Sequence, residues 1–171
     1  MSVTNLSFSE DPSLWEKRLS ALKCLAASRV NVGLTSSASG RSRFLLAIHE
    51  NGCPVMRIPA QPVIRPALDS PEAREAMSAA MGEAIAAAFS GSEPAVTAAL
   101  EKAGEAGVEA IHSYIDAGVP PPNSPVTVSG GWIYNRIAKK GVLVSGKGSN
   151  TPLIASGALY NDFDYEVKNR E

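Results

Sequence analysis

Proline residues divide this chain more sharply than any other feature of its sequence. From Cys53 to Pro71 the sequence reads CPVMRIPAQPVIRPALDSP, with prolines at positions 54, 59, 62, 66 and 71. Proline lacks a backbone N–H and fixes φ, so a segment this rich in proline excludes both a long helix and a central strand. We expect the segment to run extended and to dock its apolar side chains with little loss of conformational entropy.

The residues before this segment predict a helix, a strand and a short second helix. Asp11 followed by Pro12 is a helix-start signal, and apolar residues then recur at helical spacing at Trp15, Leu19, Leu22 and Ala26. Residues 29–34 alternate apolar and polar, as a half-buried strand does. The polar stretch TSSASGRS predicts a flexible loop, and residues 44–50 predict one or two helical turns that end at Asn51–Gly52.

Two long helices are predicted after the prolines. The first begins at Ser70–Pro71 and ends at Gly91, and every fourth position is a large apolar residue, at Met77, Met81, Ile85 and Phe89. The second ends at Gly118, and its stripe comprises Val96, Leu100, Gly104, Val108, Ile111 and Ile115. The turn between them is short, so we expect an antiparallel hairpin. Small residues at four positions would allow the backbones of the two helices to approach closely: Ala84, Ala88, Gly104 and Gly107.

The last third of the chain predicts an arm and a terminal strand. Residues 119–151 lack a helical pattern and predict an extended interaction arm, with strand character at 126–128 and 142–144. Residues 156–161 predict a helical turn, and residues 163–168 alternate as a strand. The expected fold is α+β, a single domain over residues 1–171 in which a small antiparallel sheet packs with the helical hairpin and the N-terminal helix.

The core that these elements can build is thin. Alanine supplies 25 of the apolar residues, whereas Val, Ile, Leu and Phe together number 39 of 171. That share is just above the ~20% below which chains tend to stay disordered. We therefore expect closely packed, alanine-rich helices and a subunit that gains stability by burying surface against its neighbours.

The sequence also predicts the compartment. Its apolar runs are far shorter than the ~20 residues of a membrane span, and its first residues lack a basic start followed by an apolar stretch. We expect no membrane segment, no secretory signal, synthesis in a cytoplasm, and free thiols at Cys24 and Cys53.

Charge is segregated along the chain, although the formal net charge is −1. Residues 12–66 contain eight basic and two acidic side chains, residues 72–116 contain eight acidic and two basic ones, and residues 117–161 contain four basic ones and no acid. Such blocks allow the acidic helices of one copy to face a basic loop of another, or a basic surface to meet DNA phosphates. Independently solvated faces are the alternative.

No pattern in the sequence predicts a catalytic, cofactor or metal site. The string from Gly141 to Gly148, GVLVSGKG, approaches the phosphate-binding loop GxxxxGK[ST], but Gly148 stands where a hydroxyl is needed and Pro152 blocks the following helix. Two cysteines and two distant histidines give no zinc spacing.

Each histidine has an ordinary structural interpretation. His49 and Glu50 lack the second histidine of a zinc-protease helix, so we interpret His49 as partly buried and hydrogen-bonded in a loop. His112 has Glu109 and Asp116 within one helical turn, which is typical of a solvated helix face, and we interpret it as a surface residue.

An aromatic and basic patch stands in the arm. It comprises Trp132, Tyr134, Arg136, Lys139 and Lys140. Such a patch can stack on single-stranded nucleic acid, but Trp, Tyr and Arg also dominate protein interfaces. Because other nucleic-acid-binding signatures are absent, we favour an interface anchor.

Three motifs together resemble a known family. The first, IHENGCP, supplies His49, Glu50 and Gly52; the second, RIPAQPVIRPAL, supplies Ile58, Pro59, Ala60, Pro62, Arg65, Pro66 and Ala67; the third, PLIASGALYNDFDYEV, supplies Pro152, Leu153, Ile154, Gly157, Leu159 and Val167. In this order, with two helices between the last two, they resemble the head-to-tail connector family of tailed bacteriophages, also described as neck or tail-completion proteins. That family's pattern runs IHExG, IPARPFLRPA and PLxDTGxLxxSIxxxV, and the resemblance covers roughly residues 30–168.

The chain departs from this pattern at four places. Gln61 replaces an arginine, Val63 an aromatic residue, Ala155–Ser156 an Asp-Thr pair and Asn161–Asp162 a Ser-Ile pair. These departures bear on particular side-chain contacts more than on the fold.

The resemblance implies a non-enzymatic virion protein without a cofactor. It would form a ring, six-fold like the tail, between the portal side of the capsid and the tail tube, with genomic DNA passing through the hole without sequence-specific binding. Its partners would be itself, connector proteins and tail-tube or terminator proteins, in the host cytoplasm during assembly and at the head–tail junction of the virion. The alternatives are a nucleic-acid-binding accessory protein that uses the basic arm and, third, a nucleotide-binding enzyme that uses Lys147.

Overall fold

The computed structural model describes residues 12–56, 58–135, 138–148 and 157–169. These residues form an α+β fold, which confirms the fold class that the sequence predicts. Their strands make two separate two-stranded antiparallel sheets. In chain order the elements are α1 (Pro12–Ala27), β1 (Ser28–Leu34), α2 (Gly40–Asn51), the 3₁₀ turn η1 (Pro54–Met56), α3 (Ile64–Leu68), α4 (Pro71–Ser90), α5 (Glu93–Ala117), α6 (Pro125–Ser129), β2 (Gly130–Asn135), β3 (Lys140–Ser145), α7 (Ala158–Asn161) and β4 (Phe163–Asn169).

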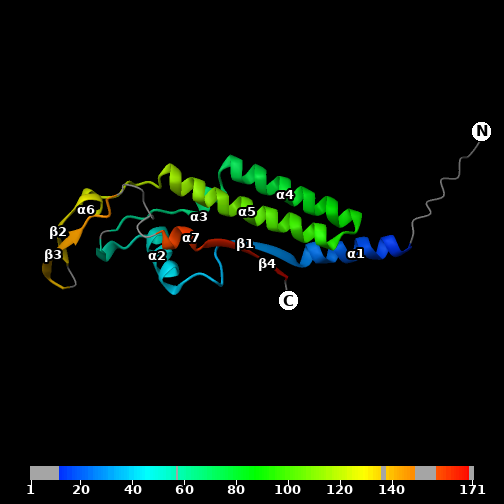
Figure 1. Cartoon of the computed structure of the whole chain (residues 1–171), viewed down its shortest axis with the longest axis horizontal. Helices are drawn as coiled ribbons and strands as arrows, with labels where there is room; N and C mark the ends of the chain where they lie inside the picture. The colour runs from blue at the N-terminus through cyan, green and yellow to red at the C-terminus, as the bar shows by residue number, and fades with distance from the viewer. Residues whose placement is uncertain (1–11, 57, 136–137, 149–156, 170–171) are drawn as a thin grey trace, which may run out of the picture.

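The molecule is elongated (Figure 1). The α4–α5 pair lies along the β1–β4 ribbon, α1 lies at one end, and the β2–β3 hairpin lies at the other end, beyond α5. Strands β1 and β4 pair from Ser28 opposite Asn169 to Leu34 opposite Phe163, which confirms a small antiparallel sheet. The sequence did not predict which strands pair, and the structure joins one strand near the start of the chain to one near its end.

Alanines form the contact face of α4. Ser70 caps this helix by accepting a hydrogen bond from the Ala73 N–H, and Gly91 ends it in the left-handed conformation. The buried residues of α4 are Ala73, Ala80, Ala84 and Ala88, so the expected alanine-rich helical hairpin is confirmed. Of the large apolar residues that mark the helix in the sequence, Met81, Ile85 and Phe89 are exposed.

Two glycines of α5 meet the sheet, whereas the sequence suggested that they would help the two helices approach. A Cβ at Gly107 would lie 2.9 Å from Val32 Cγ2, and a Cβ at Gly104 would overlap the ring of Tyr165. Glycine at these positions therefore brings the ribbon of β1 and β4 close against α5.

The core consists of two apolar clusters, one at each end of this packed body. One cluster lies where α2, α3, α7 and the end of α5 meet, and comprises Leu46, Val63, Ala67, Ile111, Ile115, Val119, Leu159 and Phe163. The other lies between α1, α4 and α5, and comprises Ala21, Ala84, Ala88, Val96, Ala99 and Leu100. Alanine supplies much of the second cluster, in keeping with a thin core.

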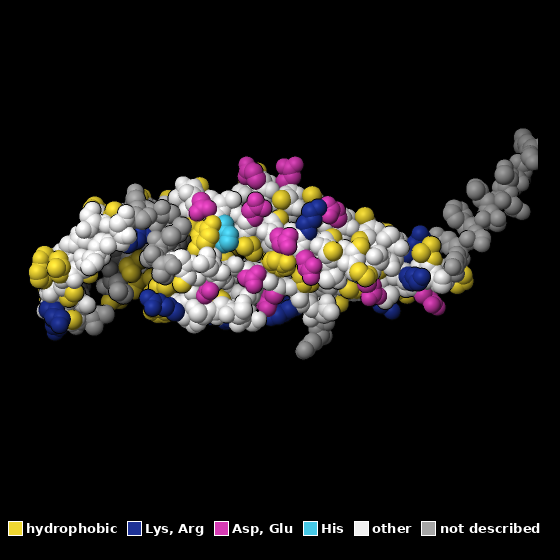
Figure 2. All heavy atoms as spheres, viewed as in Figure 1, with side chains coloured by type: hydrophobic (Ala, Val, Ile, Leu, Met, Phe, Trp, Pro, Cys, Tyr) yellow, Lys and Arg dark blue, Asp and Glu magenta, His cyan; other side chains and the backbone are white. Residues whose placement is uncertain are grey.

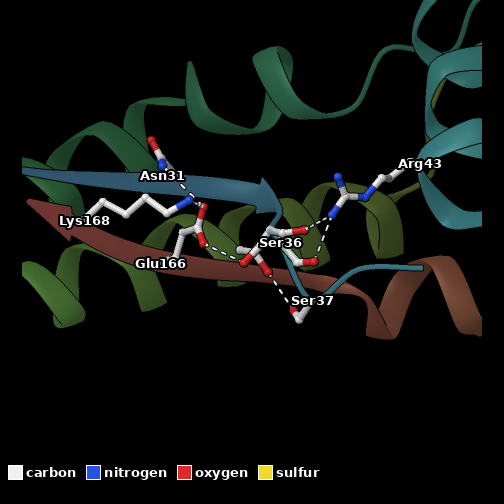
Figure 3. Close-up of polar contacts among 7 residues, drawn as sticks. Asn31, Ser36, Ser37, Arg43, Glu166 and Lys168 are labelled. Carbon is white, nitrogen blue, oxygen red and sulfur yellow. Dashed lines mark hydrogen bonds and ion pairs between the residues drawn. The ribbon is translucent and has the colours of Figure 1, made fainter. Parts of the chain in front are cut away.

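The polar stretch after β1, which begins at Thr35, is held in place by hydrogen bonds to α2 and β4, which corrects the expectation of a flexible loop. The Arg43 guanidinium donates to the carbonyl oxygens of Thr35 and Ser36, at 2.7 and 3.1 Å, and Figure 3 shows its side chain directed at this stretch. The Ser36 hydroxyl donates to the Glu166 carboxylate on β4 at 3.1 Å. The same carboxylate forms a 2.7 Å ion pair with Lys168.

Helix α2 begins earlier than the sequence suggested. The Ser39 side chain accepts a hydrogen bond from the Ser42 N–H and caps the helix, so residues 40–43 form its first turn. The helix ends at Asn51, with Gly52 after it, as predicted.

The proline segment is not extended throughout, which corrects that expectation. It holds η1 and the one-turn helix α3, and Pro66 lies in the first turn of α3. Proline is tolerated there because the first N–H groups of a helix have no partner within the helix. Val63 and Ala67 are fully buried, so the segment docks on the chain's own core.

The arm also contains more regular structure than expected. Residues 125–129 form α6, capped by Ser124 and started by Pro125, so the strand expected at 126–128 is wrong. The strand at 142–144 is confirmed within β3, and the helical turn near 156–161 is confirmed as α7. Val119 is buried in the core, so the arm begins after it. Within the part of the chain that the structure describes, no helix is both long and apolar enough to cross a membrane.

Candidate functional site

One face of the β2–β3 hairpin presents large side chains to solvent. Trp132 pairs with Leu143 and Tyr134 pairs with Gly141, so these residues point to the same side of the ribbon. The exposed fractions of Trp132, Tyr134 and Leu143 are 72%, 67% and 64%. Gly141 leaves room for the Trp132 ring, which would lie 3.4 Å from a Cβ at that position. We call Trp132, Tyr134 and Leu143 the hairpin face.

The hairpin is attached to α6 through its backbone. The N–H of Lys147 donates to Thr127 O, and the N–H of Gly148 donates to Val128 O, each at 3.0 Å. Val142 and Val144 point to the side of the ribbon opposite the hairpin face and are half-buried. Ile133, on that same side opposite Val142, is 41% exposed, so the hairpin face is the more exposed of the two sides among the described residues.

These backbone contacts also argue against nucleotide binding at Lys147. A phosphate loop needs free N–H groups, and those of Lys147 and Gly148 are already bonded to α6. A Cβ at Gly146 would overlap the backbone of Ser129 and Gly130, so this glycine serves the close packing of α6 against the hairpin.

Basic side chains lie beside the hairpin face. Lys139 and Lys140 are exposed at the turn between the strands, and Lys139 adopts a positive φ of 49°. Arg136, the third basic residue of the predicted patch, lies outside the described residues. Figure 2 shows dark blue and yellow side chains together at this end of the molecule, and magenta acidic side chains over α4 and α5. The structure therefore keeps the acidic block of residues 72–116 and the basic block of residues 117–161 on separate elements.

The first two family-like motifs meet at the junction of α2 and α3. The Gln61 N–H donates to His49 O at 2.6 Å, and Gln61 Oε1 lies 3.2 Å from His49 Nδ1. Gln61 Nε2 donates to Pro121 O at 2.5 Å, at the start of the arm. Gln61 is 4% exposed, so this position, one of the four at which the chain departs from the pattern that it resembles, is a buried link between the body and the arm.

Electrostatics at this junction favour a neutral histidine. Burial lowers the pKa of His49, and the nearby Lys147 lowers it further, against raising effects from Gln61 and Glu50. Burial also lowers the pKa of Lys147. As interpreted from the sequence, His49 is partly buried and hydrogen-bonded, although it lies in the last turn of α2 and not in a loop.

Glu50 and Gly52 fix the path of the chain between the two motifs. Glu50 Oε1 accepts hydrogen bonds from the N–H groups of Val63 and Ile64, at 2.8 and 2.9 Å, and so caps α3 from another helix. Gly52 has φ of 70°, and a Cβ there would lie 2.9 Å from both Ala60 N and Ile58 O. Four motif residues, His49, Glu50, Gly52 and Ile58, together with Gln61 therefore belong to one packed unit, the α2–α3 junction.

The other motif residues are distributed elsewhere. Pro59, Ala60 and Pro62 are exposed, and Arg65 forms a 3.6 Å ion pair with Asp69 on the surface. Of the third motif, Pro152, Leu153 and Ile154 lie outside the described residues. Gly157, with φ of 75°, precedes α7, and Leu159 is buried in the core.

His112 is not the surface residue that the sequence suggested. Its ring stacks on Tyr160 with centroids 4.1 Å apart, and its Nε2 lies 3.0 Å from Tyr160 O. The Tyr160 hydroxyl donates to Asp116 at 3.1 Å, and burial raises the pKa of this hydroxyl. His112 therefore attaches α7 to α5. Among the described residues no group of histidine, cysteine and carboxylate side chains is arranged to hold a metal, and Cys24 and Cys53 are free thiols.

The structure reveals one feature that sequence analysis missed, a groove between α4 and α5. Its volume is about 520 Å³, and it opens where the start of α4 passes the second half of α5. Its lining combines small apolar side chains, one aromatic ring and two carboxylates, at Ala67, Ala73, Ala76, Ala106, Ala110, Tyr114, Glu72 and Glu109, with Ser70 and Ser113. The only sequence signal is alanine at helical spacing, which equally indicates close packing. We call this feature the α4–α5 groove.

No protein-family model matches this chain, and no curated protein or solved structure does so either.

Proposed function

We propose that this chain is a structural protein of a tailed-bacteriophage virion. In this role it forms a ring at the head–tail junction, joins the capsid connector to the tail and leaves a channel for DNA. The single observation that carries the proposal is the hairpin face, because a small protein seldom leaves a tryptophan, a tyrosine and a leucine together in solvent unless another surface covers them.

The α2–α3 junction supports the family assignment within this proposal. Residues of the first two motifs are joined there by hydrogen bonds and close backbone packing. The motif residues His49, Glu50, Gly52 and Ile58, with Gln61, thus share one structural task, which is to hold the proline segment and the start of the arm on the body. A shared task explains why they would occur in the same order in related chains.

The construction of the body supports self-association. Its second core cluster is built mostly of alanine, while Met81, Ile85 and Phe89 of α4 stay exposed. Burial of such surface against neighbours adds stability that the isolated subunit lacks. Different surfaces meeting between identical copies close into a ring when the rotation between copies is a simple fraction of a turn.

A second candidate function is nucleic-acid binding. Trp132 and Tyr134 lie on one exposed face with Lys139 and Lys140 beside them, an arrangement on which bases can stack. Titration of the purified protein with single-stranded and duplex DNA at several salt concentrations tests this role. Tight binding by the monomer that weakens steeply with salt would favour it over the ring.

The ring itself is tested by electron microscopy and mass measurement on the purified full-length protein. We expect annular particles with a central hole and one dominant stoichiometry, six copies by analogy with the tail. A protein that stays monomeric at every attainable concentration, or that forms only open chains, would contradict the proposal.

A further inference from the structure

We propose that the α4–α5 groove of one subunit receives the β2–β3 hairpin of a second copy of this chain, with Trp132 as the anchor. The inference rests on the proposed function, since it names the two surfaces through which subunits would meet. It also makes the subunit contact head-to-tail, with a different surface used on each side.

The shape and lining of the groove suit the hairpin face. Its volume of about 520 Å³ lies within the ~300–1,000 Å³ of pockets that enclose groups of several rings. The alanines leave space for a large side chain, and the ring of Tyr114 offers an edge or a face to an incoming indole. The hairpin face provides Trp132 and Tyr134, which are the two types of side chain that most often anchor protein contacts.

The charges of the two surfaces are complementary. Glu72 and Glu109 line the groove, and a neighbouring hollow of about 310 Å³ shares Glu109 and adds Glu105 and Asp116. The hairpin brings Lys139 and Lys140, and residues 117–161 contain no acidic side chain. Docking therefore places lysines near carboxylates, and the lining of the groove contains no basic side chain. This contrast favours a second copy over an uncharged or acidic partner.

The hairpin of the same chain does not occupy the groove. It lies beyond the end of α5 (Figure 1), packs on α6, and contributes no residue to the lining. The groove and the hairpin face are therefore both available on every subunit. A contact between two unlike surfaces of identical copies propagates from subunit to subunit, which is the geometry that a ring requires.

The test uses two full-length variants, each with a matched control. Trp132→Ala removes the anchor, and Trp15→Ala is its control, because Trp15 is also exposed but lies at the opposite end of the molecule. Ala76→Arg places a long cation in the groove, and Ala86→Arg is its control at an exposed position of the same helix outside the groove. We expect at least a tenfold weaker assembly constant for the first member of each pair, measured by analytical ultracentrifugation, and no change for the controls. Circular dichroism and thermal unfolding of all four check that they fold.

Mixing the two variants gives a result that few other arrangements produce. Trp132→Ala keeps an intact groove, and Ala76→Arg keeps an intact hairpin, so an equimolar mixture can form one contact but cannot propagate it. We expect each variant alone to be monomeric and the mixture to contain dimers. A Trp15→Phe chain, in which Trp132 is the remaining tryptophan, should shift its emission to shorter wavelength on assembly.

The possible failures separate this inference from the proposed function. Rings that form normally from Ala76→Arg, or a mixture that stays monomeric, would overturn groove docking and leave the ring untouched. Open filaments that depend on Trp132 and the groove would support the docking and overturn the ring. Loss of DNA binding by Trp132→Ala, with assembly unchanged, would assign the hairpin face to nucleic acid and overturn the inference. A wild-type protein that never self-associates would overturn both.

Discussion

The ring of Tyr165 on β4 lies directly against Gly104 of α5, leaving no room for a Cβ on the helix. The atoms that such a Cβ would meet include Tyr165 Cβ at 2.9 Å, which is the base of the side chain and not its movable end. A conformationally costly glycine thus sits within a long helix to let the terminal strand approach.

Gly104→Ala should destabilise the protein despite the better helix propensity of alanine. Overpacking costs about 1–3 kcal/mol, which exceeds the ~1 kcal/mol gained in propensity, so we expect a net loss of about 1 kcal/mol in the free energy of unfolding in urea. Gly82→Ala is the control, since Gly82 lies inside α4 with open space around it. The Gly82→Ala variant should gain up to about 1 kcal/mol in the free energy of unfolding. Equal effects at the two sites would contradict this account.

Glu50→Ala should uncap α3. The variant leaves the N–H groups of Val63 and Ile64 without their acceptor, and Val63 is fully buried. Loss of a helix cap and of buried hydrogen bonds costs about 1–2 kcal/mol of unfolding free energy. Glu83→Ala, which removes an exposed ion pair with Lys102, serves as the control and should cost less than about 1 kcal/mol. A loss of unfolding free energy in Glu50→Ala no larger than that in Glu83→Ala would show that the cap contributes little.

His49 should make the folded state sensitive to mild acid. Its pKa is lowered from the ordinary value of 6.5 by burial, so below about pH 6.5 the unfolded chain binds a proton that the folded chain does not. Stability should therefore be constant above neutrality and fall as the pH drops from about 6.5 towards 5. Urea unfolding at pH 8, 7, 6 and 5 measures this slope, and His49→Gln should flatten it.

Carboxylates act in a lower pH window and can be separated from this effect. Hydrogen bonds from Ser42 and Ser39 lower the pKa of Asp162, and those from Lys168 and Ser36 lower that of Glu166, from ordinary values of 3.8 and 4.5. Their contribution to stability is present above those values and is lost only at lower pH. A slope between pH 5 and 6.5 that persists in His49→Gln would therefore exclude His49 as its source.

Assembly should weaken as salt concentration rises. Lysines of the hairpin and carboxylates near the α4–α5 groove attract one another, and salt screens exposed charges. We expect the assembly constant to fall between about 50 and 500 mM NaCl, and to fall less steeply in Lys139→Gln/Lys140→Gln. Assembly that is indifferent to salt would indicate apolar contacts alone.

Sequence patterns predicted most of the regular elements because their signals are local. Proline after a capping residue, glycine at a helix end and alternation along a strand depend on a few neighbouring residues, and α1, α4, α5, β1 and β4 lie close to where these signals placed them. The antiparallel helical hairpin followed from its short turn. Helix α3 escapes prediction because a proline-rich segment indicates extended chain, whereas proline is excluded only from the interior of a helix and Pro66 lies in the first turn.

The candidate site could be predicted only in part. The hairpin face was visible as an aromatic and basic cluster, but the side to which Trp132 and Tyr134 point depends on register and on the position of α6. The cap that Glu50 gives α3 and the stacking of His112 on Tyr160 join elements distant in the chain, and no spacing rule contains them. The groove arises from how two helices diverge, which is a property of packing.

The outward-facing side chains of α4 change how a common assay must be interpreted for this protein. Met81, Ile85 and Phe89 are exposed on an intact helix, and Phe89 is 60% accessible. A hydrophobic fluorescent dye such as ANS should therefore bind the native subunit, although such binding usually signals lost tertiary packing. For this chain, dye fluorescence would report how much of its surface remains uncovered, and sharp near-ultraviolet dichroism would be needed to judge whether it is folded.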